Sequence, residues 1–443
     1  MKDLDLDLLT SVPPGSPTVV VRNRWAAGGR GGGDVFAVFP HADGPLAVLP
    51  LDTRGPVDFY FRTRILPSLS LLPRLGIGAA VELGLARHLV PAFVAVGGSA
   101  HANAAGESEL AAHLRREWPR LVPGSAVPQR VHLARLRTRP GARSTVTILV
   151  FADDRDAPEL VLKVNRDPGY PDSVEREFAG FSAVHARVRA CGAGIPRPVF
   201  LERVGRHVVF GQTALPGRPF PVRAFQRSER VRSRLVAPLV DRAFDWLTAF
   251  HVETSSGTWT LDARFIDERC RAVFDAVVGC YPEAGAWREE LRGIERRLAK
   301  FEGALLPRGA VHGDFTHANL LFDDQRVSVV DWEDCEPDGF PLTDVFFLVC
   351  QLALSYHGEE TTGAGSFRRF LGQDGPVRKR AVDGLHAYAA RLGFDPRLVG
   401  LLLPSFLGGL LVKEYPEHRA RATYGFATVE CLRASMELGG RLA

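Results

Sequence analysis

Residues Ala310–Phe346 read AVHGDFTHANLLFDDQRVSVVDWEDCEPDGFPLTDVF, and this stretch decides how the chain is interpreted. It contains a His-Gly-Asp tripeptide that ends at Asp314, and Asn319 follows five residues later. The apolar run LLFDDQRVSVV then predicts a hairpin that ends at Asp331. The hairpin is expected to bring Asp331 back beside Asn319, so two carboxylates and a carboxamide gather in one loop cluster.

These residue types suit phosphoryl transfer from a nucleotide. That reaction needs a carboxylate that orients or deprotonates the acceptor hydroxyl, oxygen ligands for Mg²⁺, and a cation on the phosphates. Asp314 is the candidate base, while Asn319 and Asp331 offer the hard oxygen atoms that Mg²⁺ prefers. We therefore expect Mg²⁺ as the cofactor and ATP as the phosphoryl donor, with GTP as the alternative donor.

A single lysine is the candidate for the cation. Arginine carries almost all of the basic charge, and the only lysine between Lys2 and Lys300 is Lys163, in the strand-like run ELVLKV. Lysine brings a compact point charge, whereas arginine brings a planar fork. The alternative is an ordinary lysine on an edge strand of the sheet, whose head reaches water. A glutamate on the next predicted helix, Glu175 or Glu177, can hold Lys163 in place.

The pattern HGDxxxxN followed by DWE resembles the aminoglycoside phosphotransferase and choline-kinase-like family, which shares the protein-kinase-like fold. The resemblance covers about residues 130–440, and nothing in 1–125 contributes to it. It implies an enzyme that uses a nucleotide and Mg²⁺. The family's roles fall on the catalytic aspartate Asp314, the metal ligands Asn319 and Asp331, the phosphate-binding Lys163 and its helix partner Glu177.

Other nucleotide-binding candidates come from two further segments. The loop RTRPGARSTVT has one glycine, Gly141, so it does not form the G-x-G-x-x-G pattern. The segment LPGRPF resembles the part of the family just past its hinge, and we expect the hinge near residues 211–215. The additional candidates are Arg143, Ser144, Thr145, Gln212 and Ala214.

The order of the predicted elements indicates the fold class. From about residue 130, alternating and β-branched runs predict an antiparallel sheet. From Phe220 onward the pattern is nearly all helical, apart from residues 310–340. Strands followed by helices predict an α+β, protein-kinase-like fold with two lobes, an antiparallel-sheet N-lobe and a mostly helical C-lobe.

A small α/β domain is expected to precede the two lobes. Its strand-like runs are VVVRNRW, DVFAVFP and LAVLPLD. No Lys-Ser/Thr pair follows the glycines at 28–33, so a loop is favoured there over a phosphate-binding site. The expected division is 1–125 for an N-terminal domain of unknown role, 126–215 for the N-lobe and 216–443 for the C-lobe.

Composition excludes several classes of protein. The 443 residues carry 55 Lys+Arg and 51 Asp+Glu, a formal charge of +4, which does not favour nucleic-acid binding. The longest uncharged run, 398–412, contains Pro404 and is shorter than the ~20 residues of a membrane span. Six cysteines without CxxC spacing and an N-terminus without a secretory pattern favour the cytoplasm. The oligomeric state stays open.

Architectural roles are expected for three residues near the loop. His312 is expected to position the catalytic loop, His251 to pack beneath it, and Asp344 to cap the helix that follows.

The acceptor is expected to be a small molecule. Asp331 is followed within about a dozen residues by the next helix, without the A-P-E motif of protein kinases. A sugar, an aminoglycoside or a similar metabolite with a hydroxyl group is therefore favoured. The acidic run at 333–338 can attract a cationic substrate or can be a solvated turn. The alternatives are a kinase-fold binding protein without turnover, and a peptide or protein kinase of a biosynthetic pathway.

Overall fold

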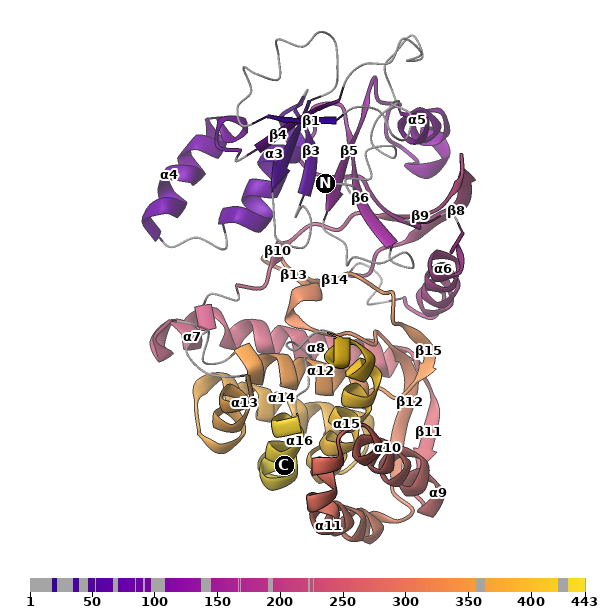
Figure 1. The fold of residues 1–443 in the computed structure, drawn as a ribbon, viewed down its shortest axis with the longest axis vertical. Coiled ribbons are helices and arrows are strands. Elements are labelled where there is room, and N and C mark those ends of the chain that lie inside the picture. The colour runs from indigo at the N-terminus through magenta and orange to yellow at the C-terminus, as the bar shows by residue number, and fades with distance from the viewer. Residues whose placement is uncertain are drawn as a thin grey trace. The chain divides into compact units, whose positions relative to one another are not determined.

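The computed structural model divides the chain into two compact units, Met1–His185 with Ile195–Arg218, and Ala186–Gly194 with Pro219–Ala443 (Figure 1). The structure describes residues 18–21, 35–39, 47–51, 53–66, 71–83, 85–90, 92–96, 108–136, 145–165, 167, 169–189, 194–221, 224–225, 227–355, 363–420 and 429–442.

Unit 1 is built on one nine-stranded sheet with the order β1-β4-β2-β3-β5-β6-β7-β9-β8, and every printed pairing is antiparallel. The strands are β1 (Thr18–Val21), β2 (Val35–Phe39), β3 (Ala47–Pro50), β4 (Ala92–Val96), β5 (Val131–Leu136), β6 (Thr145–Ala152), β7 (Leu160–Asn165), β8 (Pro198–Val204) and β9 (His207–Thr213).

The sheet has a hydrophobic core on each face, because successive side chains of a strand point to opposite faces. In β6, Val146, Ile148 and Val150 belong to one core cluster, together with side chains of α5 (Glu109–Leu121). Leu149 and Phe151 belong to a second cluster on the opposite face. That second cluster also contains side chains of α3 (Gly55–Tyr60), the π-helical turn Phe61–Ile65, α4 (Leu71–Glu82) and the 3₁₀ turn Ala86–His88.

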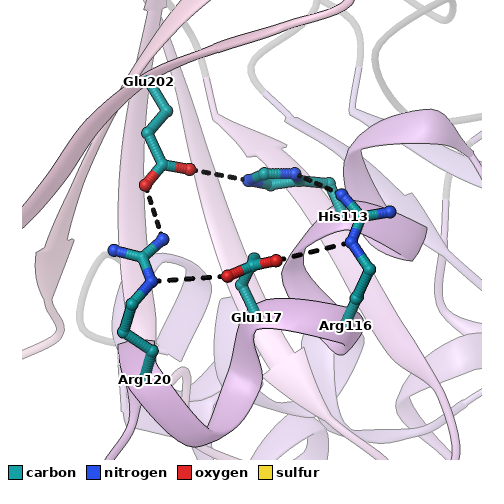
Figure 2. A network of polar contacts seen from close by, with 5 residues as sticks. All are labelled: His113, Arg116, Glu117, Arg120 and Glu202. Carbon is teal, nitrogen blue, oxygen red and sulfur yellow. Dashed lines mark hydrogen bonds and ion pairs between the residues drawn. The ribbon is translucent and has the colours of Figure 1, made fainter.

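A network of hydrogen bonds and ion pairs connects α5 to β8 (Figure 2). Glu202 of β8 accepts a hydrogen bond from Arg120 and contacts His113 Nε2 at 3.0 Å. Arg116 donates to His113 Nδ1 at 3.0 Å, and Glu117 bridges the two arginines. The helix begins at Ser108, whose hydroxyl accepts from the Ala111 amide. These contacts fix the helix that covers one face of the sheet.

The N-terminal strands and the predicted N-lobe share this sheet. Ala47 and Val48 of β3 pair with Leu136 and Arg135 of β5, so the predicted boundary at 125/126 lies within unit 1. The two units meet in sequence at 218/219, close to the predicted end of the N-lobe at 215. The division 1–125, 126–215 and 216–443 stays a prediction.

Unit 2 is mostly helical. The chain enters it through the short strand β10 (Arg218–Pro219). Its helices are α7 (Glu229–Leu235), α8 (Ala237–Glu253), α9 (Ala263–Ile266), α10 (Ala272–Cys280), α11 (Arg288–Leu298), α12 (Leu342–Ser355), α13 (Gly363–Gly372), α14 (Pro376–Leu392), α15 (Arg397–Ala420) and α16 (Val429–Leu438). Its shorter helical turns are Asp267–Arg271, Pro282–Trp287, Ala299–Phe301, His317–Asn319 and Gly439–Leu442.

Two groups of strands interrupt these helices. The hairpin of β13 (Leu320–Phe322) and β14 (Val327–Val329) has the predicted position. A second sheet has the order β11-β12-β15, with β11 (Ser255–Thr260), β12 (Leu305–Val311) and β15 (Glu336–Gly339). Strand β11 differs from the sequence prediction, which made this region helical. Its residues SSGTWT favour a strand, and the partner that completes the pairing, β12, lies about 50 residues later.

One described helix is long and apolar enough to cross a membrane by composition alone. The window Arg397–Tyr415 of α15 has a mean hydropathy of 1.4, and 61% of it is buried inside the protein. Buried core helices of globular proteins have the same composition.

Candidate active site

Unit 1 holds a buried ion pair. Lys163 Nζ lies 3.8 Å from Glu177 Oε1, and both side chains are more than nine-tenths buried. Lys163 belongs to β7, between Thr147 of β6 and Phe210 of β9. Lys163 is therefore on an inner strand of the sheet and not at an edge, which excludes the edge-lysine alternative.

Helical spacing selects the partner of this lysine. In α6 (Asp172–His185) the buried side chains recur at intervals of three or four residues, at Val174, Glu177, Phe181 and Val184. Glu177 therefore lies on the buried face, whereas Glu175 is exposed. A charge pair inside a protein is strongly destabilised if one partner is removed, because the other charge remains buried. This pair therefore fixes the position of the ammonium group.

The other nucleotide-binding candidates in unit 1 differ in their surroundings. Thr145 begins β6, opposite Asn165 of β7. Gln212 is buried in β9. The Ala214 amide already donates to the Glu159 carbonyl at 3.0 Å, so this amide is not a donor for a ligand. Arg143 and Ser144 lie outside the described residues.

Unit 2 holds the catalytic-loop candidates. Asn319 Nδ2 donates to the Asp314 carboxylate at 2.9 Å and to the Asp314 carbonyl at 2.9 Å. The Thr316 amide donates to the same carbonyl at 2.7 Å, which closes the loop tightly. With its amide nitrogen engaged in this way, Asn319 presents its carbonyl oxygen as the atom that can bind a metal. The predicted neighbours are thus in contact.

The hairpin returns the second aspartate to this loop. Strands β13 and β14 pair Leu320 with Val329, and the Val330 amide donates to the Asn319 carbonyl at 3.0 Å. Asp331 comes next, with φ of 68°. Left-handed backbone is uncommon for a residue other than glycine, and such strain gathers at functional sites. The neighbouring Gly313, with φ of 82°, has no room for a Cβ, which would lie 2.1 Å from the Asp334 carbonyl.

His312 is an architectural residue. Its Nδ1 accepts from the Asp314 amide at 3.2 Å, and its Nε2 contacts the Val330 carbonyl at 3.0 Å, as an N–H donor does. Burial lowers the pKa of His312 from its ordinary value. A neutral ring with the proton on Nε2 satisfies both contacts. The imidazole therefore connects the candidate catalytic loop to the strand that leads to Asp331, the positioning role expected from the sequence.

The Asp344 side chain holds the backbone of the loop that contains Asp314. Its two carboxylate oxygens accept from the His312 and Gly313 amides at 2.8 and 2.9 Å. His251 Nε2 lies 3.2 Å from the same carboxylate, and its Nδ1 lies 2.8 Å from the Tyr388 hydroxyl. The sequence predicted a helix cap, which is wrong. Helix α12 begins at Leu342, and the Asp344 side chain instead binds the backbone of the catalytic loop.

We expect Asp344→Asn to lower the free energy of unfolding by about 2–4 kcal/mol. Asparagine has one acceptor oxygen for two amide donors, and a hydrogen bond to a buried charge is worth about 1.5–3 kcal/mol. Urea unfolding measures the loss. The control is Asp241→Asn on α8, whose exposed ion pair with Arg380 is worth at most about 1 kcal/mol. Equal losses in the two variants would contradict this role.

His317 is buried within the loop and stacks on Phe220, with 5.5 Å between the ring centroids. Its Nε2 lies 2.8 Å from the Ser355 hydroxyl. Burial lowers the pKa of His317 to about 4. The ordinary value is about 6.5 in the unfolded chain. Between these values the unfolded chain binds more protons than the folded chain, so this histidine lowers stability as the pH falls from about 6.5 to about 4.

We therefore expect His317→Phe to reduce the dependence of stability on pH. In the wild type, His317 should account for about 2 kcal/mol of the stability lost between pH 7.5 and pH 5. Urea unfolding at the two pH values measures this difference, with His386→Phe at an exposed position as the control. An unchanged pH dependence in His317→Phe would refute the assignment.

The acidic run after Asp331 is partly neutralised. Asp334 lies 3.5 Å from Lys413 Nζ of α15. Asp338 accepts hydrogen bonds from Ser256 and Arg308. These partners favour the solvated-turn interpretation over a strong cation-binding patch.

Comparison with known proteins agrees with the phosphotransferase class that the sequence motifs predict. A family model described as "Phosphotransferase enzyme family" matches residues 136–388, more than half of the chain. The search of curated protein sequences found no match.

Solved structures are similar to the chain at low identity. A glucosamine kinase in complex with glucosamine, ADP and inorganic phosphate has 16% identity and a TM-score of 0.45, over 98% of this chain and 95% of that one. An aminoglycoside phosphotransferase in complex with GDP and kanamycin has 15% identity and a TM-score of 0.39, over 74% of this chain and 97% of that one.

The family match defines the class of this protein, the phosphotransferases. The chain belongs to the phosphotransferase enzyme family, and its α+β, kinase-like fold class is as predicted.

Proposed function

We propose that the protein transfers the γ-phosphoryl group of ATP, with Mg²⁺, to a hydroxyl group of a small molecule such as a sugar, an aminoglycoside or a similar metabolite. The contact that carries this proposal is the hydrogen bond from Asn319 to the Asp314 carboxylate, beside the hairpin that ends at Asp331. A proton acceptor and two oxygen donors next to one another are what this chemistry requires.

In this proposal Asp314 orients the acceptor hydroxyl and accepts its proton as the new O–P bond forms. Its Oδ2 accepts a hydrogen bond from the Asn319 amide, which orients the carboxylate. The hydrogen bonds of the Asp314 backbone to His312 and Asn319 keep the carboxylate in one place. Such positioning supplies most of the rate enhancement in phosphoryl transfer.

Asn319 and Asp331 fit Mg²⁺ in the chemistry of their donor atoms. Both offer oxygen, and Mg²⁺ is usually held by one or two protein groups together with water and substrate phosphates. The described residues contain no cluster of three or more His, Cys, Asp or Glu that can hold a metal. When bound, the ion would neutralise charge on the phosphate oxygens.

Unit 1 supplies the nucleotide-binding side chains in this proposal. Lys163, held by Glu177, would contact phosphate oxygens. Thr145 and Gln212 would lie near the nucleotide, and Arg143 and Ser144 complete the predicted set. We retain Ala214 through its carbonyl oxygen only, because its amide is engaged.

A small-molecule acceptor is favoured by the short connection after the metal-binding residue. Between Asp331 and the start of α12 at Leu342 there are ten residues, four of which form β15. Peptide-directed kinases carry a longer docking segment there. We further propose that the protein acts in the cytoplasm, on a nucleotide and a small molecule and without nucleic acid.

Thermal unfolding with Mg²⁺ alone, Mg·ATP and Mg·GTP tests the nucleotide site. A ligand at ~100 times its Kd adds ~2.7 kcal/mol, or a few degrees in Tm. We expect this shift in the wild type and its loss in Asp331→Ala. Lys163→Arg should also lose it, because a planar fork does not replace a point charge in a packed strand. Asp324→Ala in the exposed β13–β14 turn is the control.

Acceptor screening then tests the substrate class. ADP release is measured with a panel of sugars, amino sugars and aminoglycosides, and separately with a peptide library. Turnover with a small hydroxyl compound supports the proposal. Turnover that only peptides stimulate, or nucleotide binding without any turnover, would contradict it and support one of the alternative functions.

A further inference from the structure

One helix of unit 1 is apolar and yet mostly exposed. Helix α4 lies on the outside of unit 1 and has the sequence LLPRLGIGAAVE, with one arginine and one glutamate as its only charged residues (Figure 1). Among those of its residues whose exposure is described, Val81 alone is buried. A surface helix normally turns polar side chains outward, whereas a helix that is apolar on all sides is normally buried. The composition of α4 therefore indicates that another surface covers its outer face.

Leucines form much of the exposed surface of this segment. Leu75 and Leu83 are 61% and 72% exposed, and Leu85 and Leu89, which follow the helix, are 46% and 43% exposed. Four of the nine large hydrophobic side chains that are exposed in the described part of the chain thus lie within residues 75–89. Single exposed leucines are ordinary, but a group of them on one short segment marks an interaction surface.

The outer face of α4 has an arrangement that can pair with itself. Ile77 and Val81 pack against the core cluster on the inner side. Leu75, Ala79 and Leu83 recur at intervals of four residues on the opposite side, where all three are exposed. This row reads Leu-Ala-Leu in both directions, with the small side chain at its centre. Two copies of the row, related by a two-fold axis close to Ala79, therefore present the same residues to each other, as a two-fold interface requires.

Small residues beside this row leave room for a leucine of a second copy. Apart from the backbone of the helix itself and the chain neighbours, no atom of the described residues lies within 4 Å of the position that a Cβ on Gly76 would take. Gly76 and Ala79 therefore leave a shallow hollow on the outer face. In an antiparallel pair of α4 helices, Leu83 of one copy lies over the hollow of the other. Rows of side chains at intervals of four residues pack into grooves in this way, with about 8–10 Å between the helix axes.

The charges of this segment fit an identical partner better than a charged one. With one arginine and one glutamate, α4 carries no net charge. Glu82 also lies 3.5 Å from the Arg62 guanidinium, which contacts Asp156 at 2.9 Å. Helices that bind anionic membranes carry several basic residues on their polar face, which α4 does not. Two neutral faces of the same kind can meet without repulsion.

The size of this face sets the strength of the contact that it can make. A helix of 12 residues is about 18 Å long. A contact between two such helices and the leucines that follow them lies at the lower end of the range for specific interfaces, about 1,200 Å² in total. Interfaces of this size form dimers that exchange with the monomer.

We propose that the protein forms an exchanging homodimer in which α4 of one copy packs antiparallel against α4 of the other, with Ala79 at the crossing point. Leu75 and Leu83 form the centre of the interface, and Leu85 and Leu89 extend it. This inference is independent of the proposed function, since it uses none of the proposed nucleotide-binding, catalytic or metal-binding residues.

Sedimentation velocity of the full chain over a range of concentrations tests the dimer. We expect the mass to rise with concentration from 48.4 kDa towards twice that value. In Leu83→Glu the Kd of the dimer should rise about hundredfold, because the interface would bury unpaired carboxylates. The matched control is Leu305→Glu, the same change at a 52% exposed position of β12, which should leave this Kd unchanged. Both variants should keep the Tm of the monomer.

Two further variants separate pairing from folding and locate the crossing point. In Gly76→Leu the Tm of the monomer should rise, because leucine is a better helix former than glycine and meets open space in the single chain. The Kd of the dimer should nevertheless rise about tenfold, because the hollow is filled. Oxidation of Ala79→Cys should link two copies into a covalent dimer on a non-reducing gel, whereas the wild type should not be linked.

Three results would overturn the inference. The first is a wild type that stays monomeric at every concentration. The second is a dimer whose Kd is unchanged in Leu83→Glu or in Gly76→Leu, or that Ala79→Cys does not link, since such a dimer uses another surface. The third is a monomer that binds vesicles of phosphatidylserine and phosphatidylcholine and loses this binding in Leu83→Glu, which would assign the face to a lipid surface.

Discussion

Asp314→Asn is expected to lower kcat by about 10²–10⁴ while leaving Mg·ATP binding unchanged. Removal of a general base has this effect on the rate. The asparagine keeps the size of the side chain, and its carbonyl oxygen can still accept the hydrogen bond that Asn319 donates to Asp314 at 2.9 Å. The backbone contacts of Asp314 with His312 and Asn319 also remain, so the loop should keep its conformation. Only the proton acceptor is lost.

Acceptor-dependent ADP release measures the rate, and calorimetry measures nucleotide binding. The matched control is Asp324→Asn, the same change at an exposed position of the β13–β14 turn, which should leave both values unchanged. Full turnover in Asp314→Asn would refute the role of Asp314 as the base. A loss of nucleotide binding equal to the loss of rate would make Asp314 a binding residue.

The geometry of the candidate catalytic loop could be predicted from the sequence because its determinants are local. Asn319 is five residues from Asp314, and the tight hairpin between Asn319 and Asp331 is encoded by two short apolar strands with a polar turn. The choice between Glu175 and Glu177 was also contained in the sequence, since the spacing Val174, Glu177, Phe181 follows a helical face. Short-range periodicity is enough in both cases.

Features that depend on distant segments could not be predicted in the same way. The role of Asp344 requires a contact across about 30 residues with the backbone amides of His312 and Gly313. Its position near a helix start suggested a local cap, and the tertiary contact prevailed. The engagement of the Ala214 amide likewise depends on the Glu159 carbonyl, far away in sequence. The type of a residue does not indicate which distant backbone group it will hydrogen-bond.

The sheet of unit 1 is the largest feature that local patterns did not indicate. The family model begins at residue 136, yet β5 begins at Val131 and pairs with β3 on one side and β6 on the other. Strand β4 was not predicted, although it pairs with both β1 and β2. Each strand alone reads as a short apolar run, and only the pairing shows that the N-terminal segment extends the kinase-like sheet.

Side chains from the N-terminal segment also contribute to the stability of the sheet, because they belong to the core cluster on each of its faces. On one face, Leu114 and Trp118 of α5 pack in the same cluster as Ile148 and Leu162. On the other face, N-terminal side chains such as Phe39 and Tyr60, which contact each other at 4.6 Å, share a cluster with Leu149 and Phe151. Each face of the strands around Lys163 is thus covered by side chains that precede residue 126. Burial of such side chains is worth about 1.5–3 kcal/mol each.

Deletion of residues 1–125 is therefore expected to abolish cooperative folding of unit 1. The deletion removes β1, β2, β3 and β4 together with α3, α4 and α5. The free energy lost with their buried side chains exceeds the total stability of a typical domain, which is about 5–15 kcal/mol. The fragment 126–443 should show no nucleotide-dependent shift in Tm. In the full chain, Trp118→Ala should cost about 3–5 kcal/mol in urea unfolding, because Trp118 is fully buried. Trp287→Ala, at a partly exposed position of unit 2, should cost less. A fragment that unfolds cooperatively and still binds Mg·ATP would instead establish residues 1–125 as a separable domain.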